Sequence, residues 1–194
     1  MIQTVREGDP LFLLPEGEIS YFGESLPIDD SIAKLAKRLK VDIITAVSHG
    51  GYVSSPRWAY KLRKYRFVFI EFRVLLTKEE LKEMPVEEVY TKIKEKLFVN
   101  DFDFQREKMI KVGGRKRALG LEKFLFACPE CNSLVTLESH DNDIICTNCN
   151  AVATLDEYGF IQGSKYDNMQ DWHLFQDTLR DKLVLETFST SALI

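Results

Sequence analysis

The four cysteines of this sequence lie in two pairs with the same internal spacing. Cys128 and Cys131 form one Cys-x-x-Cys pair, Cys146 and Cys149 form another, and fourteen residues separate the two pairs. A Cys-x-x-Cys turn presents two thiolates from one tight loop, so two such turns at the ends of a hairpin can form the tetrahedral four-sulfur shell that zinc prefers. The pattern predicts one zinc ion bound by all four cysteines.

Two other uses of paired cysteines fit the sequence less well. Disulfides are typical of small secreted domains, whereas a chain of this length can bury a core without them. A redox dithiol needs only one Cys-x-x-Cys pair. Four thiolate ligands also leave no open coordination position for water or substrate, so the predicted zinc is structural rather than catalytic.

The residues between and after the two pairs predict the β-structure that would hold the cysteines. An apolar segment over 134–137 leads into a polar turn over 139–142, and residues 144–145 lead back toward the second pair. Further strand material follows at 151–155 and 158–161. This arrangement is typical of a zinc ribbon.

Zinc ribbons often bind nucleic acid, but the charge of this one argues against that role. Residues 128–163 contain no Lys or Arg, and a nucleic-acid complex would require them for phosphate neutralisation. His140 falls in the predicted turn, where we expect it to be solvated because the cysteines already fill the metal shell. We therefore expect no nucleic-acid partner and a role in protein contact or domain stability. The acidic residues of the segment are Glu130, Glu138, Asp141, Asp143, Asp156 and Glu157.

Upstream of the ribbon, apolar runs alternate with helical patterns. Runs over 11–14 and 42–48 predict buried strands, and a helical repeat over 32–39 lies between them behind Asp30 and Ser31, either of which could cap it. Strand, helix and strand in this order predict a parallel crossover. Three further elements continue the alternation: a strand over 67–76, a capping box over 77–80 and a helix from Pro85.

The first residues resemble the last turn of a helix. Ile2 and Val5 precede a stop signal of Gly and Pro over 8–10. A parallel sheet whose first strand follows a helix normally has another strand before that helix. We therefore expect a further segment upstream of Met1.

The predicted fold class is α/β, in three parts. Residues 1–117 would form the C-terminal part of a mixed or parallel sheet with helices, residues 118–163 the small β zinc ribbon, and residues 164–194 a helical tail. In the tail, Trp172, Phe175 and Leu179 form an apolar stripe that predicts packing rather than chemistry.

A family resemblance enters at the end of the first predicted strand. Residues 13–20, Leu-Leu-Pro-Glu-Gly-Glu-Ile-Ser, resemble the Phe-Pro-Glu-Gly-Thr-Arg-Ser block of the glycerophospholipid acyltransferase family, which includes the lysophosphatidate acyltransferases. Pro27, the helix after it and the strand over 41–47 follow in the order that the family has. Residues 50–52 and 55–58 are similar to a bacterial branch that carries a zinc ribbon after the acyltransferase domain. The resemblance covers about residues 1–163.

The resemblance implies acyl transfer from an acyl thioester donor to the hydroxyl of a lysophospholipid or glycerol phosphate acceptor. It assigns Glu16 and Gly17 to the substrate site. In the family a His of a His-x-x-x-x-Asp motif, upstream of the Pro-Glu-Gly block, acts as general base. Here the residues five positions after His49, His140 and His173 are Ser, Ile and Thr, so no catalytic residue is assigned and the motif is expected in the upstream segment.

One position departs from the family pattern. The block usually has an Arg two residues after the Gly, typical of a phosphate ligand, and here that residue is Ile19. Either another cation binds phosphate, with Arg57 as first candidate, or the activity is lost. Without the resemblance, a plain strand-ending turn explains Pro15 and Gly17, and an exposed surface cation explains Arg57.

Two functions follow as alternatives. The first is an acyltransferase-like protein of phospholipid synthesis, inactive as this chain alone because the His and Asp pair is absent. The second is a non-catalytic zinc-ribbon interaction protein derived from such an enzyme. Ile19 and the absent pair favour the second for the chain as given.

Composition sets the expected location. The 194 residues are 45% hydrophobic and 29% charged with a net charge of -4, which is typical of a soluble globular chain. The most hydrophobic segment, 67–76, is interrupted by Glu71 and Arg73, and polar residues follow Met1, so neither a membrane span nor a signal peptide is expected. We predict a cytoplasmic location, and any membrane contact would be peripheral.

A basic cluster could make that contact. Five cations fall within ten residues that contain no acid, and aromatic residues are interleaved with them. This composition fits an anionic membrane surface, and a solvated basic loop is the alternative. The cations are Arg57, Lys61, Arg63, Lys64 and Arg66, and the aromatics are Trp58, Tyr60 and Tyr65.

Overall fold

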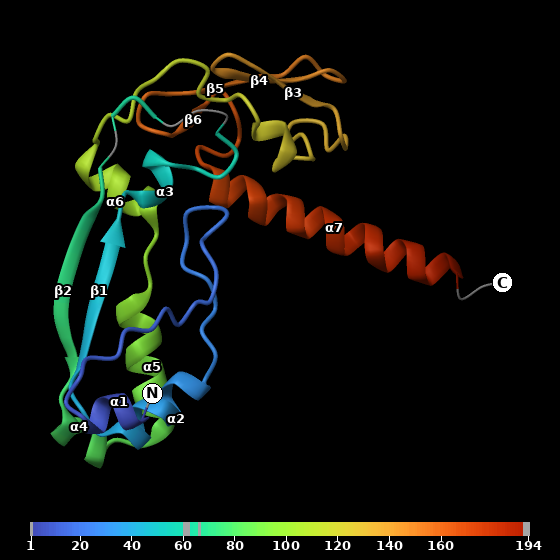
Figure 1. Cartoon of the computed structure of the whole chain (residues 1–194). Helices are drawn as coiled ribbons and strands as arrows, with labels where there is room; N and C mark the ends of the chain where they lie inside the picture. The colour runs from blue at the N-terminus through green and yellow to red at the C-terminus, as the bar shows by residue number, and fades with distance from the viewer. Residues whose placement is uncertain (1, 60–62, 66, 192–194) are drawn as a thin grey trace. The chain divides into compact units, whose positions relative to one another are not determined.

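The structure is a computed structural model that describes residues 2–59, 63–65 and 67–191 and divides the chain into two compact units (Figure 1). Unit 1 comprises residues 1–20, 24–49 and 69–100. Unit 2 comprises residues 21–23, 50–68 and 101–194. The structure is α/β with two antiparallel sheets, one in each unit. The three-part division predicted from the sequence stays a prediction.

The sheet of unit 1 consists of two strands, β1 (Ile43–His49) and β2 (Phe69–Leu76). Both strands were predicted, but they pair antiparallel, with Ala46 opposite Phe72 and a register shift between Ile43 and Ile44. β1 buries Thr45 and Val47 on one face, but Ile44 is 65% exposed on the other, so the strand is half-buried and not fully buried as predicted.

The strand predicted over residues 11–14 is absent, and the predicted parallel crossover is absent with it. The segment has no regular structure, and Phe12 and Leu14 are both 76% exposed. Pro10 and Pro15 flank it, and because proline has no backbone N–H, neither flanking residue can donate to extend a strand ladder. Apolar composition indicated burial here, and the prediction was wrong.

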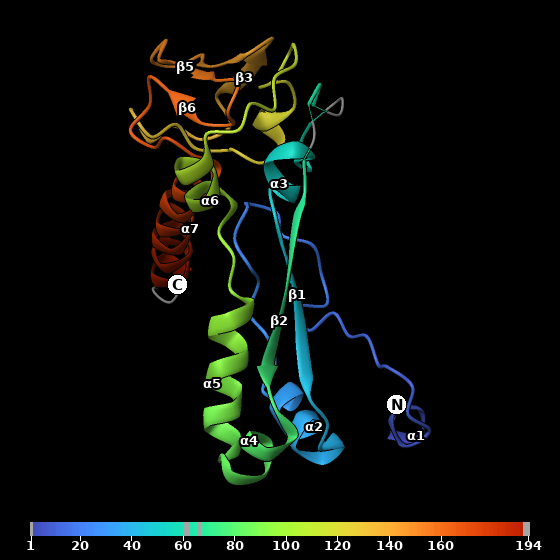
Figure 2. The same ribbon diagram turned by 90° about the vertical axis from the view of Figure 1, so that its left-hand side faces the viewer.

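Four helices belong to unit 1: α1 (Ile2–Arg6), α2 (Ser31–Leu39), α4 (Lys78–Glu83) and α5 (Val86–Leu97). Figure 2 shows α2 and α4 near the end of the sheet where β1 begins and β2 ends. The buried side chains of α2, α4 and α5 form one apolar cluster with Leu76 of β2. The helical members of the cluster are Ala33, Ala36, Leu81, Val89 and Ile93.

The capping box predicted over residues 77–80 is confirmed. The hydroxyl of Thr77 accepts a hydrogen bond from the backbone N–H of Glu80 at 3.2 Å, and the Glu80 carboxylate accepts one from the backbone N–H of Thr77 at 2.8 Å. These contacts satisfy two backbone donors that the first turn of α4 leaves free.

The sheet of unit 2 is a four-stranded antiparallel meander. Its order is β3 (Leu137–His140), β4 (Asp143–Cys146), β5 (Val152–Leu155) and β6 (Ile161–Gln162). The predicted hairpin is confirmed: a two-residue turn joins β3 to β4. The strand predicted over 158–161 is wrong in its placement: residues 158–160 lie in a turn, and β6 begins at Ile161.

The helices of unit 2 pack on this sheet around a single apolar core. They are α3 (Gly51–Ser54), α6 (Asp101–Lys108), a 3-10 turn (Leu121–Lys123) and α7 (Met169–Ser191). The largest buried members of the core include Trp58, Phe102, Leu121, Leu125 and Trp172. Gly120 has φ +99°, and a Cβ there would lie 2.3 Å from the Trp58 carbonyl oxygen, so this close approach requires glycine.

Among the described residues, no helix has both the length and the apolar composition needed to cross a bilayer.

Candidate metal centre

The sulfur atoms of Cys128, Cys131, Cys146 and Cys149 all lie within 4.8 Å of one another. The Cys128 and Cys149 sulfurs are 3.7 Å apart, and the Cys131 and Cys146 sulfurs are 3.8 Å apart. A disulfide would bring two sulfurs to about 2.05 Å. Zinc–sulfur bonds of about 2.3 Å at tetrahedral angles place ligand sulfurs about 3.8 Å apart. The four cysteines could therefore hold a metal ion, and their spacing fits a tetrahedral one.

The two Cys-x-x-Cys turns have the same backbone hydrogen bonds. The N–H of Asn132 donates to the carbonyl of Cys128 at 2.9 Å, and the N–H of Asn150 donates to the carbonyl of Cys146 at 2.8 Å. Both asparagines are left-handed, with φ of 59° and 61°. Asparagine tolerates that conformation better than most residues, so a shared Cys-x-x-Cys-Asn sequence builds two equivalent turns. The asparagine after each pair is a signal in the sequence that the prediction of the metal site did not use.

Hydroxyl and amide groups surround two of the four sulfurs. Ser133 Oγ lies 3.0 Å from the Cys131 sulfur, and Asn148 donates to the same sulfur at 3.5 Å. These contacts, led by that of Ser133, lower the pKa of Cys131 to about 7. Burial acts to raise the pKa of Cys146, but hydrogen bonds led by Thr136 Oγ1, at 3.3 Å from the sulfur, lower it to about 5. Both thiols are thus prepared to serve as thiolate ligands.

Cys128 lies in a different environment. It is buried in the apolar core of unit 2, and burial raises the pKa of its thiol to about 12. A cation placed against this sulfur would favour its thiolate form, because a coordinating thiol is deprotonated by the metal.

Helix α7 positions the first Cys-x-x-Cys turn. The side chain of Gln176, fully buried, accepts the backbone N–H of Phe126 at 2.6 Å and of Ala127 at 3.0 Å, and donates to the Phe124 carbonyl at 3.2 Å. Trp172 donates its indole N–H to the Ala127 carbonyl at 2.9 Å. The predicted packing of the tail helix is thereby extended: α7 holds the chain immediately before Cys128 by hydrogen bonds.

His140 is exposed, as predicted, and lies 3.5 Å from a carboxylate oxygen of Glu138. Among the described residues, the potential metal ligands that lie close together are the four cysteines. His140 is not one of them.

The residues predicted for substrate binding lie in separate units. Glu16 and Gly17 belong to unit 1, and Arg57 belongs to unit 2. The Glu16 carboxylate accepts the backbone N–H of Leu26 at 3.1 Å, which ties the Pro-Glu-Gly turn to the segment before α2. Gly17 has φ +71°, and nothing lies within 4 Å of a Cβ built there.

Arg57 is exposed, and its guanidinium lies against the tyrosine ring of Tyr21. The guanidinium carbon is 4.4 Å from the ring centroid, and Nη1 donates to the Tyr21 hydroxyl at 3.1 Å. This cation–π contact orients the side chain while leaving its charge accessible.

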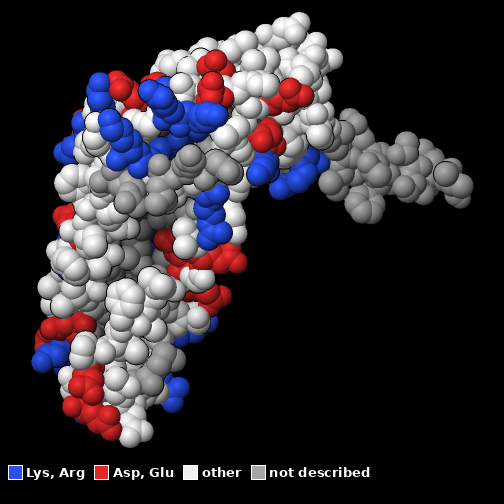
Figure 3. All heavy atoms as spheres, turned by 45° about the horizontal axis from the view of Figure 1, so that its top comes forward, with Lys and Arg blue, Asp and Glu red and all other residues white. Residues whose placement is uncertain are grey.

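The basic cluster predicted for a membrane surface is only partly exposed. Arg63 is 6% exposed and donates to the Arg117 carbonyl at 3.1 Å, and burial lowers its pKa to about 10. Lys64 is exposed, with Nζ 4.9 Å from the Tyr65 ring centroid. Lys61 and Arg66 lie outside the described residues. Figure 3 shows Lys and Arg side chains close together in the upper part of the view, with Asp and Glu side chains beside them.

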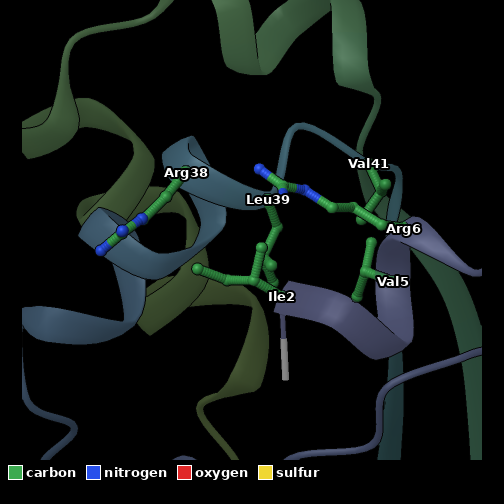
Figure 4. A pocket seen from close by; sticks show the side chains of 6 residues that line it. All are labelled: Ile2, Val5, Arg6, Arg38, Leu39 and Val41. Atoms are coloured by element: carbon green, nitrogen blue, oxygen red, sulfur yellow. The ribbon is translucent and has the colours of Figure 1, made fainter.

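A pocket of about 250 Å³ lies in unit 1 between α1 and the end of α2. Four aliphatic side chains line it together with two arginines, Arg6 and Arg38, which point in different directions (Figure 4). None of the residues predicted for substrate or metal binding lines this pocket. The aliphatic residues are Ile2, Val5, Leu39 and Val41.

Comparisons with known proteins gave no match among family models, curated proteins or solved structures.

Proposed function

We propose that this chain binds one structural zinc ion through Cys128, Cys131, Cys146 and Cys149. The observation that carries the proposal is the spacing of the sulfurs, 3.7 and 3.8 Å in two of the pairs and within 4.8 Å in all of them, which is compatible with a tetrahedral zinc shell. Four ligands from one side chain type fill that shell, so the ion would stabilise the ribbon rather than bind substrate. The zinc would also neutralise part of the charge of four adjacent thiolates.

Metal analysis of the purified protein tests this proposal. We expect one zinc per chain, and less than half of that in a Cys146→Ser variant. Cys149→Ser should have a similar effect, since loss of either ligand opens the shell. Ser164→Ala, which removes a hydroxyl from unit 2 but no ligand, is the matched control. Purified protein without stoichiometric metal, after zinc was supplied during expression, contradicts the proposal.

Chelation tests the structural role separately. Because metal binding is folding free energy in such modules, a chelator should abolish hydrogen-exchange protection over β3, β4 and β5. The sheet of β1 and β2 belongs to the other unit and should keep its protection. Zinc that is removed without any change in exchange contradicts a structural ion.

We further propose that the chain belongs to an acyltransferase-like protein of phospholipid synthesis that works at the cytoplasmic face of a membrane. The reaction would transfer an acyl group from a thioester to the hydroxyl of lysophosphatidate or a related glycerol phosphate. The support is the resemblance of residues 13–20 combined with a following zinc ribbon. The open backbone at Gly17 and the hydrogen-bonded carboxylate of Glu16 are compatible with a turn that a ligand approaches.

An acyltransferase assay with an acyl thioester and lysophosphatidate tests this second proposal in two proteins. Residues 1–194 alone should show no turnover, because they contain no His-x-x-x-x-Asp and a positioned base contributes about 100-fold to 10,000-fold. A longer protein that adds such a motif upstream should be active, and Glu16→Ala should reduce its activity. An inactive longer protein would point to Ile19 and to the non-catalytic interaction protein instead.

A further inference from the structure

One face of the sheet in unit 1 is apolar and exposed. Ile70, Phe72 and Val74 alternate along β2 and are 57%, 70% and 63% exposed. Residues opposite one another in an antiparallel pair share a face, and Ala46 and Ile44 lie opposite Phe72 and Val74 on β1. Both β1 residues are exposed as well. Side chains of this kind are normally covered in a folded protein.

The same strand has an edge to which no further strand is joined. In the part of the chain that the structure describes, the sheet consists of β1 and β2 alone, and β1 pairs along one side of β2 (Figure 1). An edge strand presents backbone N–H and C=O groups that can form a ladder with another strand. β2 is eight residues long, and it contains no proline to prevent such pairing.

The sequence of β2 is complementary to itself about Phe72. When two copies of β2 lie antiparallel with Phe72 opposite Phe72, residue 71 lies opposite residue 73 and residue 70 opposite residue 74. Glu71 then faces Arg73 of the second copy on both sides of the centre, and Ile70 faces Val74. Opposite charges and pairs of β-branched side chains stabilise directly opposed positions.

The neighbouring symmetric registers lack this complementarity. Centring the pair on Glu71 sets two carboxylates opposite each other, and centring it on Arg73 sets two guanidinium groups opposite each other, which destabilises a sheet. Within one chain Glu71 and Arg73 already form an exposed ion pair. In the register centred on Phe72 the four groups of two chains alternate in sign.

We propose that β2 is a self-association edge through which two copies of this chain form a four-stranded antiparallel sheet. The strand order is β1-β2-β2-β1, with the two-fold axis passing between the two Phe72 residues. Such an isologous interface uses the same surface of both copies and closes after two. The paired Phe72 rings and the Ile70–Val74 pairs bury the facing sides of these exposed side chains against one another. This inference does not depend on zinc binding or acyl transfer.

Sedimentation equilibrium of the zinc-loaded chain tests the proposal. We expect a concentration-dependent species with twice the 22.4 kDa chain mass. E71R and R73E should each raise the dissociation constant by at least about tenfold, because each sets like charges opposite each other at two symmetric positions. The double variant E71R/R73E should restore association. K92E, which reverses an exposed charge on α5, is the control and should leave the constant unchanged.

Cross-linking tests the register. Cβ atoms of directly opposed residues lie about 4.5–5.5 Å apart, so F72C should form an intermolecular disulfide under mild oxidation with zinc in excess. I44C places a similarly exposed cysteine on β1, roughly 20 Å from its counterpart because the two positions lie three strand spacings apart and about four residues apart along the strands, and it should not cross-link. A chain that stays monomeric at all concentrations overturns the proposal. So does a dimer that is insensitive to the charge exchange, or one cross-linked by I44C and not by F72C.

Discussion

Gln176 accepts the backbone N–H of Ala127 at 3.0 Å, one residue before the first cysteine of the metal centre. The carbonyl of the same Ala127 accepts the indole N–H of Trp172 at 2.9 Å, so both polar groups of one peptide residue are held by α7. The side chains of Gln176 and Trp172 are both almost completely buried. The helix that follows the ribbon is therefore a part of the support for the Cys128 turn.

We expect Gln176→Ala to destabilise unit 2 by about 2–4 kcal/mol, because it leaves buried backbone N–H groups without an acceptor. Urea unfolding of the zinc-loaded protein, followed by tryptophan fluorescence, measures the loss. Leu174→Ala alters a side chain that is 51% exposed on the same helix and should cost less than about 1 kcal/mol. Equal effects of the two substitutions would show that the hydrogen bonds of Gln176 contribute little.

Gln176 illustrates what the sequence could not predict. An apolar stripe predicts which face of a helix is buried, but it does not predict that a polar residue on that face meets backbone groups fifty positions earlier. The cysteine cluster was predictable because four thiols at this spacing have few chemical uses. The α4 capping box was predictable because its hydrogen bonds join residues three positions apart.

The strand predicted over 11–14 was also wrong because its formation depends on contacts between residues far apart in the sequence. Its apolar letters indicate burial, yet a strand needs a partner, and the partner of β1 is β2. Which strands pair is decided by contacts between residues far apart in the sequence. The order of the elements therefore suggested a parallel crossover where the structure has an antiparallel pair.

Asp101 is a second buried polar group whose removal should be costly. It is 4% exposed, and its carboxylate accepts the backbone N–H of Gly50 at 2.8 Å and of Tyr52 at 2.7 Å at the start of α3. We expect Asp101→Ala to lower the free energy of unfolding by about 2 kcal/mol, and Asp101→Asn to lose less because one acceptor remains. Chemical denaturation checks this. Glu107→Ala, exposed on the same helix, should change little, and a comparable loss there would contradict the role of Asp101.

His173 should make unit 2 sensitive to mild acid. Its ring stacks on Phe22 with centroids 3.5 Å apart, and burial lowers its pKa from the ordinary value of 6.5, with Asp177 opposing the shift and Arg180 adding to it. A lowered pKa means that the fold favours the neutral ring. Its contribution to stability is complete above pH 6.5 and is lost as the pH falls through the folded-state pKa.

The acid sensitivity is checked with His173→Phe, which keeps a ring against Phe22 and removes the titration. With zinc in excess, so that ligand protonation affects both proteins equally, the wild-type chain should lose more stability than the variant between pH 7 and pH 5. Thermal unfolding at several pH values measures the difference. Parallel pH profiles for the two proteins would contradict the assignment.

Binding to anionic membranes is the last prediction, and it rests on the exposed cations Arg57 and Lys64. Each lies over an exposed tyrosine ring, Tyr21 or Tyr65, and a cation beside an aromatic ring is typical of the membrane interface. We expect weak binding to vesicles that contain phosphatidylserine, decreasing as salt shortens the Debye length to about 10 Å at 0.1 M.

Charge reversal at Lys64 is the sharpest test of this surface, because Arg63, its neighbour, is buried and its substitution would disturb the core. Each cation near an anionic surface contributes about 1 kcal/mol, so Lys64→Glu should weaken vesicle binding by at least about fivefold. Lys34→Glu reverses an exposed charge in unit 1 and should leave vesicle binding unchanged. Co-sedimentation with vesicles measures both variants. Equal binding to neutral vesicles would contradict the electrostatic account and favour a solvated basic loop.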